Sequence, residues 1–135
     1  MGILRRLEAN FDPIGSEATS TRVGIGVASG CDAVFLTTDS SLVESSRLLP
    51  LAIADDLRTG VMEWSGHYLV NPLDRDGLVD LGHYPLLGRY LSAHVDGLSA
   101  RHCAKEQRKR WYRTIDRVDP ELTSKPKLNA IQLEP

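Results

Sequence analysis

Residues 84–113, YPLLGRYLSAHVDGLSARHCAKEQRKRWYR, form the longest periodic segment of the chain. Pro85 suits the first position of a helix, because its missing N–H would have no partner there. Apolar side chains then recur at helical spacing, at Leu87, Leu91, Val95 and Leu98. We therefore predict one long central helix over about residues 85–109. Gly88 and Gly97 weaken this helix by roughly 1 kcal/mol each relative to alanine, so tertiary packing must stabilise it.

The same segment ends in the densest charge cluster of the chain. Residues 101–117 contain seven basic and two acidic residues, a local net charge of +5. A packed helix with a basic, aromatic-bearing end is typical of a nucleic-acid contact. It is equally typical of a solvated helix end, where cations favour the macrodipole. On the first interpretation, the DNA-binding residues are Arg101, Lys105, Arg108, Lys109, Arg110, Trp111, Tyr112 and Arg113.

Composition indicates one domain at most, with a cytoplasmic location. The chain has 135 residues, of which 41% are hydrophobic and 25% charged, as in ordinary globular proteins. No run approaches the ~18 apolar residues of a membrane span, so we predict no membrane association. Cys31 and Cys103 show no spacing motif, which favours a reducing compartment.

Charge is distributed unevenly along the chain. Residues 1–80 carry 6 basic and 12 acidic residues, a balance of −6, whereas residues 81–135 carry 10 and 6, a balance of +4. A phosphate backbone would therefore meet the second half, with strong salt dependence. The acidic first half would instead suit docking on a protein partner.

Short strands and turns surround the predicted helix. Residues 21–38 read as two strands around a turn at 29–32, because Val23, Ile25 and Val27 alternate with small residues. Gly24 and Gly26 in this pattern indicate close approach of another backbone or a ligand. Further strand candidates are residues 61–71, 111–115 and 127–128, and short helical pieces are expected within 39–48 and 73–84. The predicted fold class is α+β, with short mixed β-strands packed around one long central helix.

No strong catalytic or metal-binding motif is present. The four histidines and two cysteines form no H-x-x-x-H or C-x-x-C pair, so no metal site is predicted. His94 lies near the apolar stripe and is predicted to pack in the core. The adjacent carboxylates Asp55 and Asp56 are expected to cap a helix or line a turn rather than to catalyse a reaction.

The order of the segments resembles the target-recognition region of N6-adenine DNA methyltransferases, the restriction-modification class with a TaqI-like C-terminal specificity domain. The resemblance covers about residues 21–128. The pieces that carry it are VGIGVASGCDAVF (23–35), LLPLAIADDLRTG (48–60), HYLVNP (67–72), YPLLGRYLSAHVDGLSAR (84–101) and KRWYRTI (109–115). It implies a DNA-binding specificity module of a site-specific adenine-N6 DNA methyltransferase, with double-stranded DNA as its partner.

The resemblance implies that the catalytic half of such an enzyme lies outside this chain. S-adenosylmethionine would bind there, so we expect no cofactor here and no methyl transfer by this chain alone. Asn71-Pro72 matches the Asn-Pro-Pro-Tyr loop of these enzymes for two residues only, and Leu73-Asp74 offers no aromatic ring to stack on an extruded base. We therefore predict a turn at this position.

The expected organisation is a lead-in over residues 1–20 followed by one target-recognition domain over 21–135. The start of the lead-in, MGILRRLEA, has the pattern of a short amphipathic helix that needs a surface to pack on. Trp111 fits a structural anchor as well as a base contact, because aromatic side chains dominate core burial. Two alternative functions remain: a subunit that docks on a separate methyltransferase catalytic subunit, and an inactive, truncated gene product.

Overall fold

The structure is a computed structural model that describes residues 2–21, 24, 26–105, 108–118 and 125, with only the backbone of residue 108. The described α-helices are α1 (Ile3–Asn10), α2 (Asp32–Phe35), α3 (Pro85–Ala93), α4 (Val95–Ala100) and α5 (His102–Lys105). The described strands are β1 (Leu36–Thr37), β2 (Leu48–Pro50) and β3 (Tyr68–Val70). Short 3-10 helices are η1 (Glu17–Thr19), η2 (Ser45–Arg47), η3 (Ala54–Leu57), η4 (Leu81–His83) and η5 (Arg108–Arg110). The predicted α+β class is confirmed.

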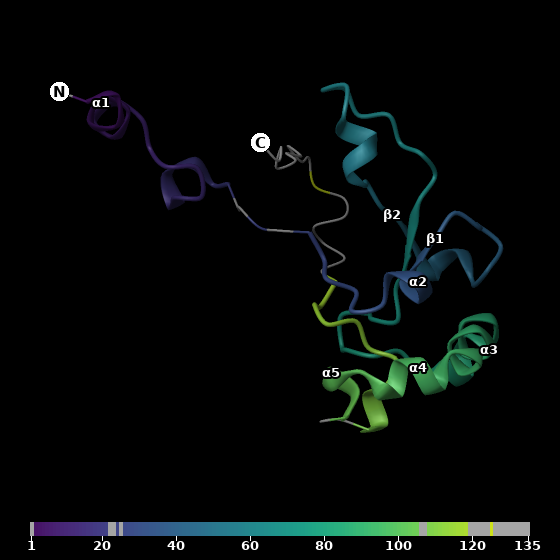
Figure 1. Cartoon of the computed structure of the whole chain (residues 1–135). Helices are drawn as coiled ribbons and strands as arrows, with labels where there is room; N and C mark the ends of the chain where they lie inside the picture. Colours follow the sequence, from purple (N-terminus) through teal and green to yellow (C-terminus); the bar gives the residue numbers. More distant parts are fainter. Residues whose placement is uncertain (1, 22–23, 25, 106–107, 119–124, 126–135) are drawn as a thin grey trace.

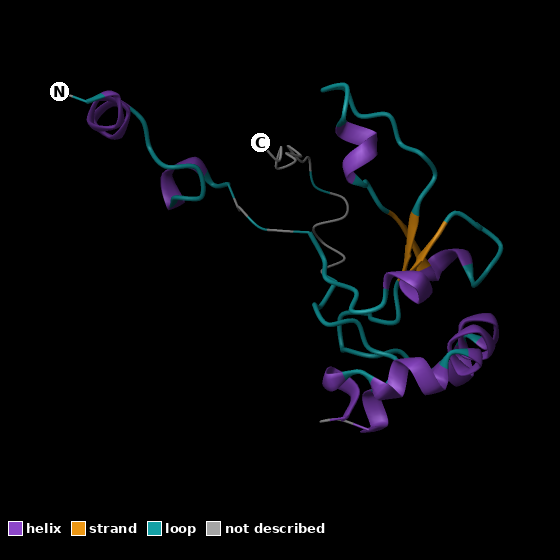
Figure 2. Ribbon diagram, in the orientation of Figure 1, coloured by secondary structure: helices purple, strands orange, loops and turns teal. Residues whose placement is uncertain are grey.

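The sheet is small and antiparallel, in the order β1-β3-β2 (Figure 2). Leu36 pairs with Leu69, and Leu48 pairs with Val70. The central strand falls within the predicted strand segment 61–71, where aromatic and β-branched side chains favour a pleated surface. Pro50 lies at the end of edge strand β2, a position in which its missing N–H is tolerated.

The hydrophobic core lies between this sheet and the helices α3 and α4 (Figure 1). Its largest fully buried apolar side chains are Phe35, Leu87, Leu91, Leu98 and Val70. Three of the four residues in the predicted apolar stripe are therefore buried, but Val95 is 38% exposed. The stripe correctly located the helices that cover the sheet.

The single helix predicted over about residues 85–109 is wrong. Three short helices occupy this region instead, because the backbone leaves helical geometry twice. His94 has φ −110° and ψ 13°, and Arg101 has φ −66° and an extended ψ of 147°. The break at His94 explains the exposure of Val95, since α4 does not continue the register of α3. His94 itself is exposed, with its ring edge-on to Tyr90 at 5.0 Å, so its predicted place in the core is also wrong.

Two predicted strands are absent from the described residues. The segment 33–36 is mostly helical, in α2, because Val34 and Phe35 are adjacent and both buried, which a strand with one buried face does not allow. The segment 111–115 is irregular. Residues 22–23 and 25 of the first predicted strand, and 127–128 of the last one, lie outside the described part of the chain.

The predicted turn at 29–32 is confirmed, and it contacts the end of the described chain. Gly30 has φ +77°, and an added Cβ would lie 2.7 Å from the side chain of Ile115, so glycine is required there. The Ile115 N–H donates to Ser29 O. The Ala28 N–H donates to the Asp116 carboxylate at 2.8 Å, and the Asp116 N–H donates to Ala28 O at 3.0 Å. By contrast, no atom of the described residues would lie within 4 Å of a Cβ added at Gly24 or Gly26, so the described part of the chain does not show the close backbone approach predicted there.

Helix α1 stands away from the rest of the described chain, at the N-terminal end (Figure 1). None of its residues is buried. Across the described ranges, no helix has the length and apolar character that a membrane span requires.

Glu44 caps helix α3 from a distant part of the chain. Its carboxylate accepts hydrogen bonds from the N–H groups of Leu86 at 2.8 Å and Leu87 at 3.0 Å. Burial opposes ionisation, but these backbone hydrogen bonds and the nearby Arg47 outweigh it and hold the pKa of Glu44 below its ordinary value. A carboxylate at a helix N-terminus also favours the macrodipole.

We expect Glu44→Gln to lower the free energy of unfolding by about 1 kcal/mol at neutral pH, because a charged cap is lost. The folded-state pKa is depressed, so this stabilisation is present above the unfolded-state pKa and is lost as pH falls through the folded-state pKa. The two proteins should therefore converge in stability as the pH falls below the ordinary glutamate value of 4.5. Urea unfolding at a series of pH values measures this, and a constant difference at all pH values would contradict the assignment.

Candidate nucleic-acid interface

Among the predicted site residues, Arg101 lies between α4 and α5, and the others lie on α5, on η5 and on the irregular segment that follows η5 (Figure 1). The short elements arise because Arg101 is extended, which turns the chain away from α4. Residues 111–116 then return along the turn at 29–32, through the hydrogen bonds from Ile115 and Asp116. The basic cluster is thus a surface corner held in place by contacts with a distant part of the chain.

Arg101 is the centre of this corner and is half-buried. Its Nε donates to Leu98 O at 3.0 Å, and its NH1 donates to Ser29 O at 3.3 Å. Its NH2 donates to the carbonyl oxygens of Trp111 at 2.9 Å and Arg113 at 2.8 Å. The guanidinium carbon also lies 5.3 Å from the centre of the Phe35 ring. Five donors in a rigid fork suit this role, which a lysine could not fill.

Trp111 and Tyr112 both pack against the core and are half-buried. Their rings meet edge-to-face, with centroids 5.3 Å apart. The Tyr112 hydroxyl donates to Val79 O at 2.8 Å. Burial, and then the charge of Asp80, raise the pKa of Tyr112. Tyr112 therefore holds the corner to the core through its hydroxyl, while Trp111 lies at the edge of the core.

The remaining predicted residues differ in how accessible they are. Lys105, Lys109 and Arg110 are exposed, and Arg108 contributes its backbone to η5. Arg113 is half-buried, and its guanidinium donates to the carbonyls of Thr114 at 3.3 Å and Ile115 at 3.4 Å. The structure thus brings the predicted residues together, but gives Arg101, Tyr112 and Arg113 intramolecular partners and leaves the lysines facing solvent.

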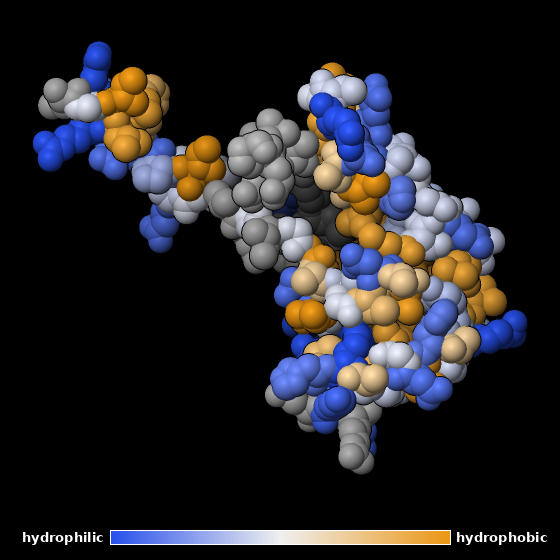
Figure 3. Space-filling view, viewed as in Figure 1, coloured by the Kyte–Doolittle hydropathy of each residue, from blue (hydrophilic) through white to orange (hydrophobic). Residues whose placement is uncertain are grey.

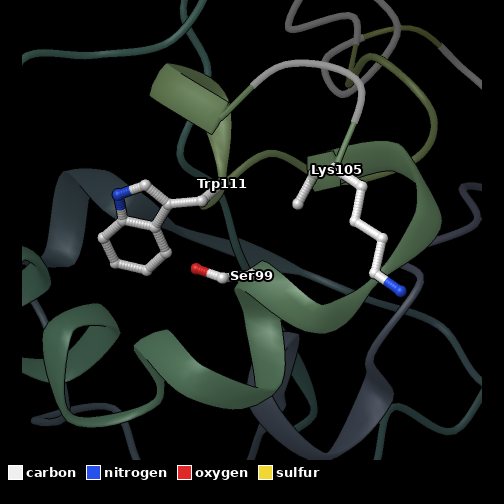
Figure 4. A pocket seen from close by; sticks show the side chains of 4 residues that line it. Ser99, Lys105 and Trp111 are labelled. Carbon is white, nitrogen blue, oxygen red and sulfur yellow. The ribbon is translucent and has the colours of Figure 1, made fainter.

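A surface hollow of about 520 Å³ lies beside the exposed Lys105. Its described lining consists of Ser99, Ala104, Lys105 and Trp111 (Figure 4). The Ser99 hydroxyl points toward the indole ring, whereas the Lys105 ammonium extends away from it toward the outside. An aromatic ring and a hydroxyl in one hollow, with a cation that extends outward from its edge, suit a nucleotide, which offers a base or sugar face and a phosphate. Sequence reasoning missed Ser99 and Ala104, which carry no motif and lie on two different helices, α4 and α5.

The adjacent carboxylates Asp55 and Asp56 have structural partners within the fold. Asp56 accepts hydrogen bonds from the N–H groups of Ile53 at 3.1 Å and Ser65 at 3.0 Å, and hydrogen bonding from Ser65 holds the pKa of Asp56 below its ordinary value. Asp55 forms an exposed ion pair with Arg58 at 2.5 Å. The predicted capping and turn role is confirmed. Among the described residues, no group of three or more His, Cys, Asp or Glu side chains could hold a metal ion.

Asn71 forms a turn, as predicted. Its side-chain oxygen accepts a hydrogen bond from the Leu73 N–H at 3.0 Å, the geometry of an Asx turn. Asn71 is also buried, at the end of β3. The amide is thus used to shape the chain after the strand.

Comparison with known proteins places the chain beside methyltransferases. It is 49% identical over 130 residues to the type II methyltransferase M.PaeR7I of Pseudomonas aeruginosa, which covers 95% of this chain and 22% of that protein. It is 45% identical over 130 residues to M.XhoI of Xanthomonas vasicola, covering 95% and 23%. It is 39% identical over 128 residues to M.BstVI of Geobacillus stearothermophilus, covering 93% and 23%. No protein-family model matches the chain.

The chain is therefore similar to one segment of type II methyltransferases and spans less than a quarter of their length. The predicted resemblance to methyltransferases is confirmed at this level.

Proposed function

We propose that this chain, as a relative of one segment of type II methyltransferases, is a DNA-contacting specificity segment of an adenine-N6 DNA methyltransferase. The observation that carries the proposal is the basic corner, in which exposed Lys105 lines the hollow together with Trp111 and Lys109 is exposed on η5. Charge supports it, because residues 101–117 carry +5 in a chain whose net charge is −2. Such a corner attracts a phosphate backbone while the rest of the surface does not.

The residues of the corner divide into two groups. Lys105, Lys109 and, from its place in the same basic run, Arg108 would contact phosphates, with Arg110 beside them. Trp111 and Ser99 would meet a sugar or a base edge at the hollow. Arg101 and Tyr112 would act as positioning residues, because their polar groups are used on backbone carbonyls.

The chemistry of methyl transfer is proposed to lie in another part of such an enzyme. S-adenosylmethionine would bind there, together with the loop that receives the extruded adenine. In this chain the matching dipeptide, Asn71-Pro72, forms a buried turn and presents no aromatic ring. This chain would therefore position double-stranded DNA and leave the reaction to the catalytic part.

We expect the double variant Lys105→Ala/Lys109→Ala to weaken binding of a mixed-sequence duplex and to flatten its salt dependence. Each lost phosphate contact lowers the slope of log K against log salt by about 0.9, so the two together lower it by roughly 2. Fluorescence anisotropy of the full chain at several salt concentrations measures both quantities.

The matched control is Arg89→Ala, which removes an exposed cation from α3 rather than from the corner. It should leave the slope unchanged. A slope that is the same in wild type and the lysine variant would remove these two residues from the interface. Absence of salt-dependent binding by the wild-type chain at low salt would overturn the proposed function.

A further inference from the structure

Helix α1 carries an apolar face that nothing in the described structure covers. Ile3, Leu4 and Leu7 fall within about 100° of the helix circumference, the width of a face that normally meets a core. Phe11 follows directly at the C-cap. Their exposed fractions are 76%, 73%, 50% and 69% in chain order. Arg5 and Arg6 occupy the opposite side, so the helix is amphipathic.

This exposure is unusual for a stable surface. Single exposed apolar residues are common, but several on one face of one element indicate an interaction site. Figure 3 shows apolar surface gathered on α1, at the N-terminal end that Figure 1 places apart from the sheet and helices. An isolated helix of 8 residues is marginal in water, so a partner surface must supply its stability.

The lengths of the relatives indicate what could cover the apolar face of α1. The match with M.PaeR7I covers 95% of this chain, so only about 5% of its residues lie outside the match and the nine-residue apolar stretch 3–11 cannot lie wholly outside it. In that protein the matched segment is 22% of the length, which leaves more than three quarters of a polypeptide to surround it.

We infer that α1 docks, through Ile3, Leu4, Leu7 and Phe11, on the part of a type II methyltransferase that lies outside this segment. The contact is of the helix-in-groove kind, in which an amphipathic helix lays its apolar face in a hydrophobic groove. Acidic side chains at the rim of that groove would meet Arg5 and Arg6. The inference rests on the proposed function in naming the partner, and it adds the surface that joins the two parts.

Trypsin provides the test, because Arg5 and Arg6 lie on the docking helix itself. The two proteins to compare are the full 135-residue chain and full-length M.PaeR7I with its matched segment replaced by this chain. Cleavage at Arg5 or Arg6 should be at least about tenfold slower in the replacement protein, because docking protects the helix. Leu4→Asp/Leu7→Asp should abolish this protection while leaving the thermal melting of the isolated chain unchanged.

The control variant is Val61→Asp, which places the same charge on an apolar residue outside α1 that is 66% exposed. It should retain the protection. Equal cleavage rates in the two wild-type proteins would overturn the inference. So would ultracentrifugation that shows a dimer of the isolated chain dissociated by Leu4→Asp/Leu7→Asp, since the face would then belong to a second copy.

The outcome is separable from that of the proposed function. DNA anisotropy of the isolated chain does not require docking, so Leu4→Asp/Leu7→Asp should bind the duplex as wild type does. Protection without DNA binding would leave the docking surface standing and remove the DNA-contacting role. DNA binding without protection from trypsin would support the DNA-contacting role and remove the docking surface.

Discussion

Replacing Arg101 with alanine is expected to lower the free energy of unfolding by about 3 kcal/mol or more, because hydrogen bonds from a charged donor contribute roughly 1.5–3 kcal/mol each. The guanidinium joins four carbonyl groups from three parts of the chain: Leu98, Ser29, and the pair Trp111 and Arg113. Its loss would remove the donor from the carbonyls of Trp111 and Arg113, while Ser29 O and Leu98 O would each keep a backbone N–H. Natural domains have only about 5–15 kcal/mol in total, so much of the stability would be removed.

Urea unfolding followed by circular dichroism and tryptophan fluorescence measures this effect. Arg101→Lys should recover little, because an ammonium cannot reproduce the planar fork. Arg89→Ala is the matched control, and its exposed site predicts a change within about 0.5 kcal/mol. An Arg101→Ala protein of unchanged stability but weakened DNA affinity would instead make Arg101 a DNA contact.

Replacing Phe35 with alanine is expected to lower the free energy of unfolding by about 3–5 kcal/mol, the range for a buried phenylalanine. Phe35 has no exposed surface and belongs to the core cluster with Leu87 and Val70. Its ring also faces the guanidinium of Arg101 at 5.3 Å, so truncation removes a cation–π contact together with the packing.

Phe11→Ala is the matched control, because it deletes the same atoms from a ring that is 69% exposed. It should change the stability of the isolated chain by no more than about 0.5 kcal/mol. Thermal and urea unfolding of both variants would measure the two changes in stability. Equal losses at the two positions would mean that residues 32–35 do not pack as the structure places them.

Elements specified by local signals could be predicted. The strand at 68–70, the turn at 29–32 and the 3-10 helix at 81–83 each follow from patterns within a few residues. The capping role of Asp56 also follows from its place in the first turn of a short helix, where its side chain can reach back to the N-cap N–H. These signals do not depend on what a distant part of the chain supplies.

The prediction of one long central helix failed because a contact with a distant part of the chain interrupts that helix. Its apolar spacing is real, since Leu87, Leu91 and Leu98 are all buried. The spacing does not reveal that Arg101 must leave helical geometry, because the carbonyl of Ser29 that it bonds is 72 residues away in the chain. Gly97 lowers the local helix propensity, so the tertiary contact prevails more readily.

The basic cluster could be found from composition, but the roles within it could not. Arg101 and Lys105 look alike in sequence, yet Arg101 is half-buried among carbonyls and Lys105 faces solvent. What separates them is the pairing of residues 28–29 with 115–116, a long-range contact without a sequence signal. The hollow beside Trp111 depends on the same contact, which is why Ser99 escaped notice.

The two hydrogen bonds that join Ala28 to Asp116, one of them to the Asp116 carboxylate, also bear on inheritance. Where the entry and exit of a unit meet, the unit can be cut from one polypeptide and grafted into another without displacing the flanking chain. A unit over residues 28–118, which includes the buried Val118, would then be exchangeable at a single place. Recombination there would transfer the basic residues of 101–117 together with the core side chains that hold them in place.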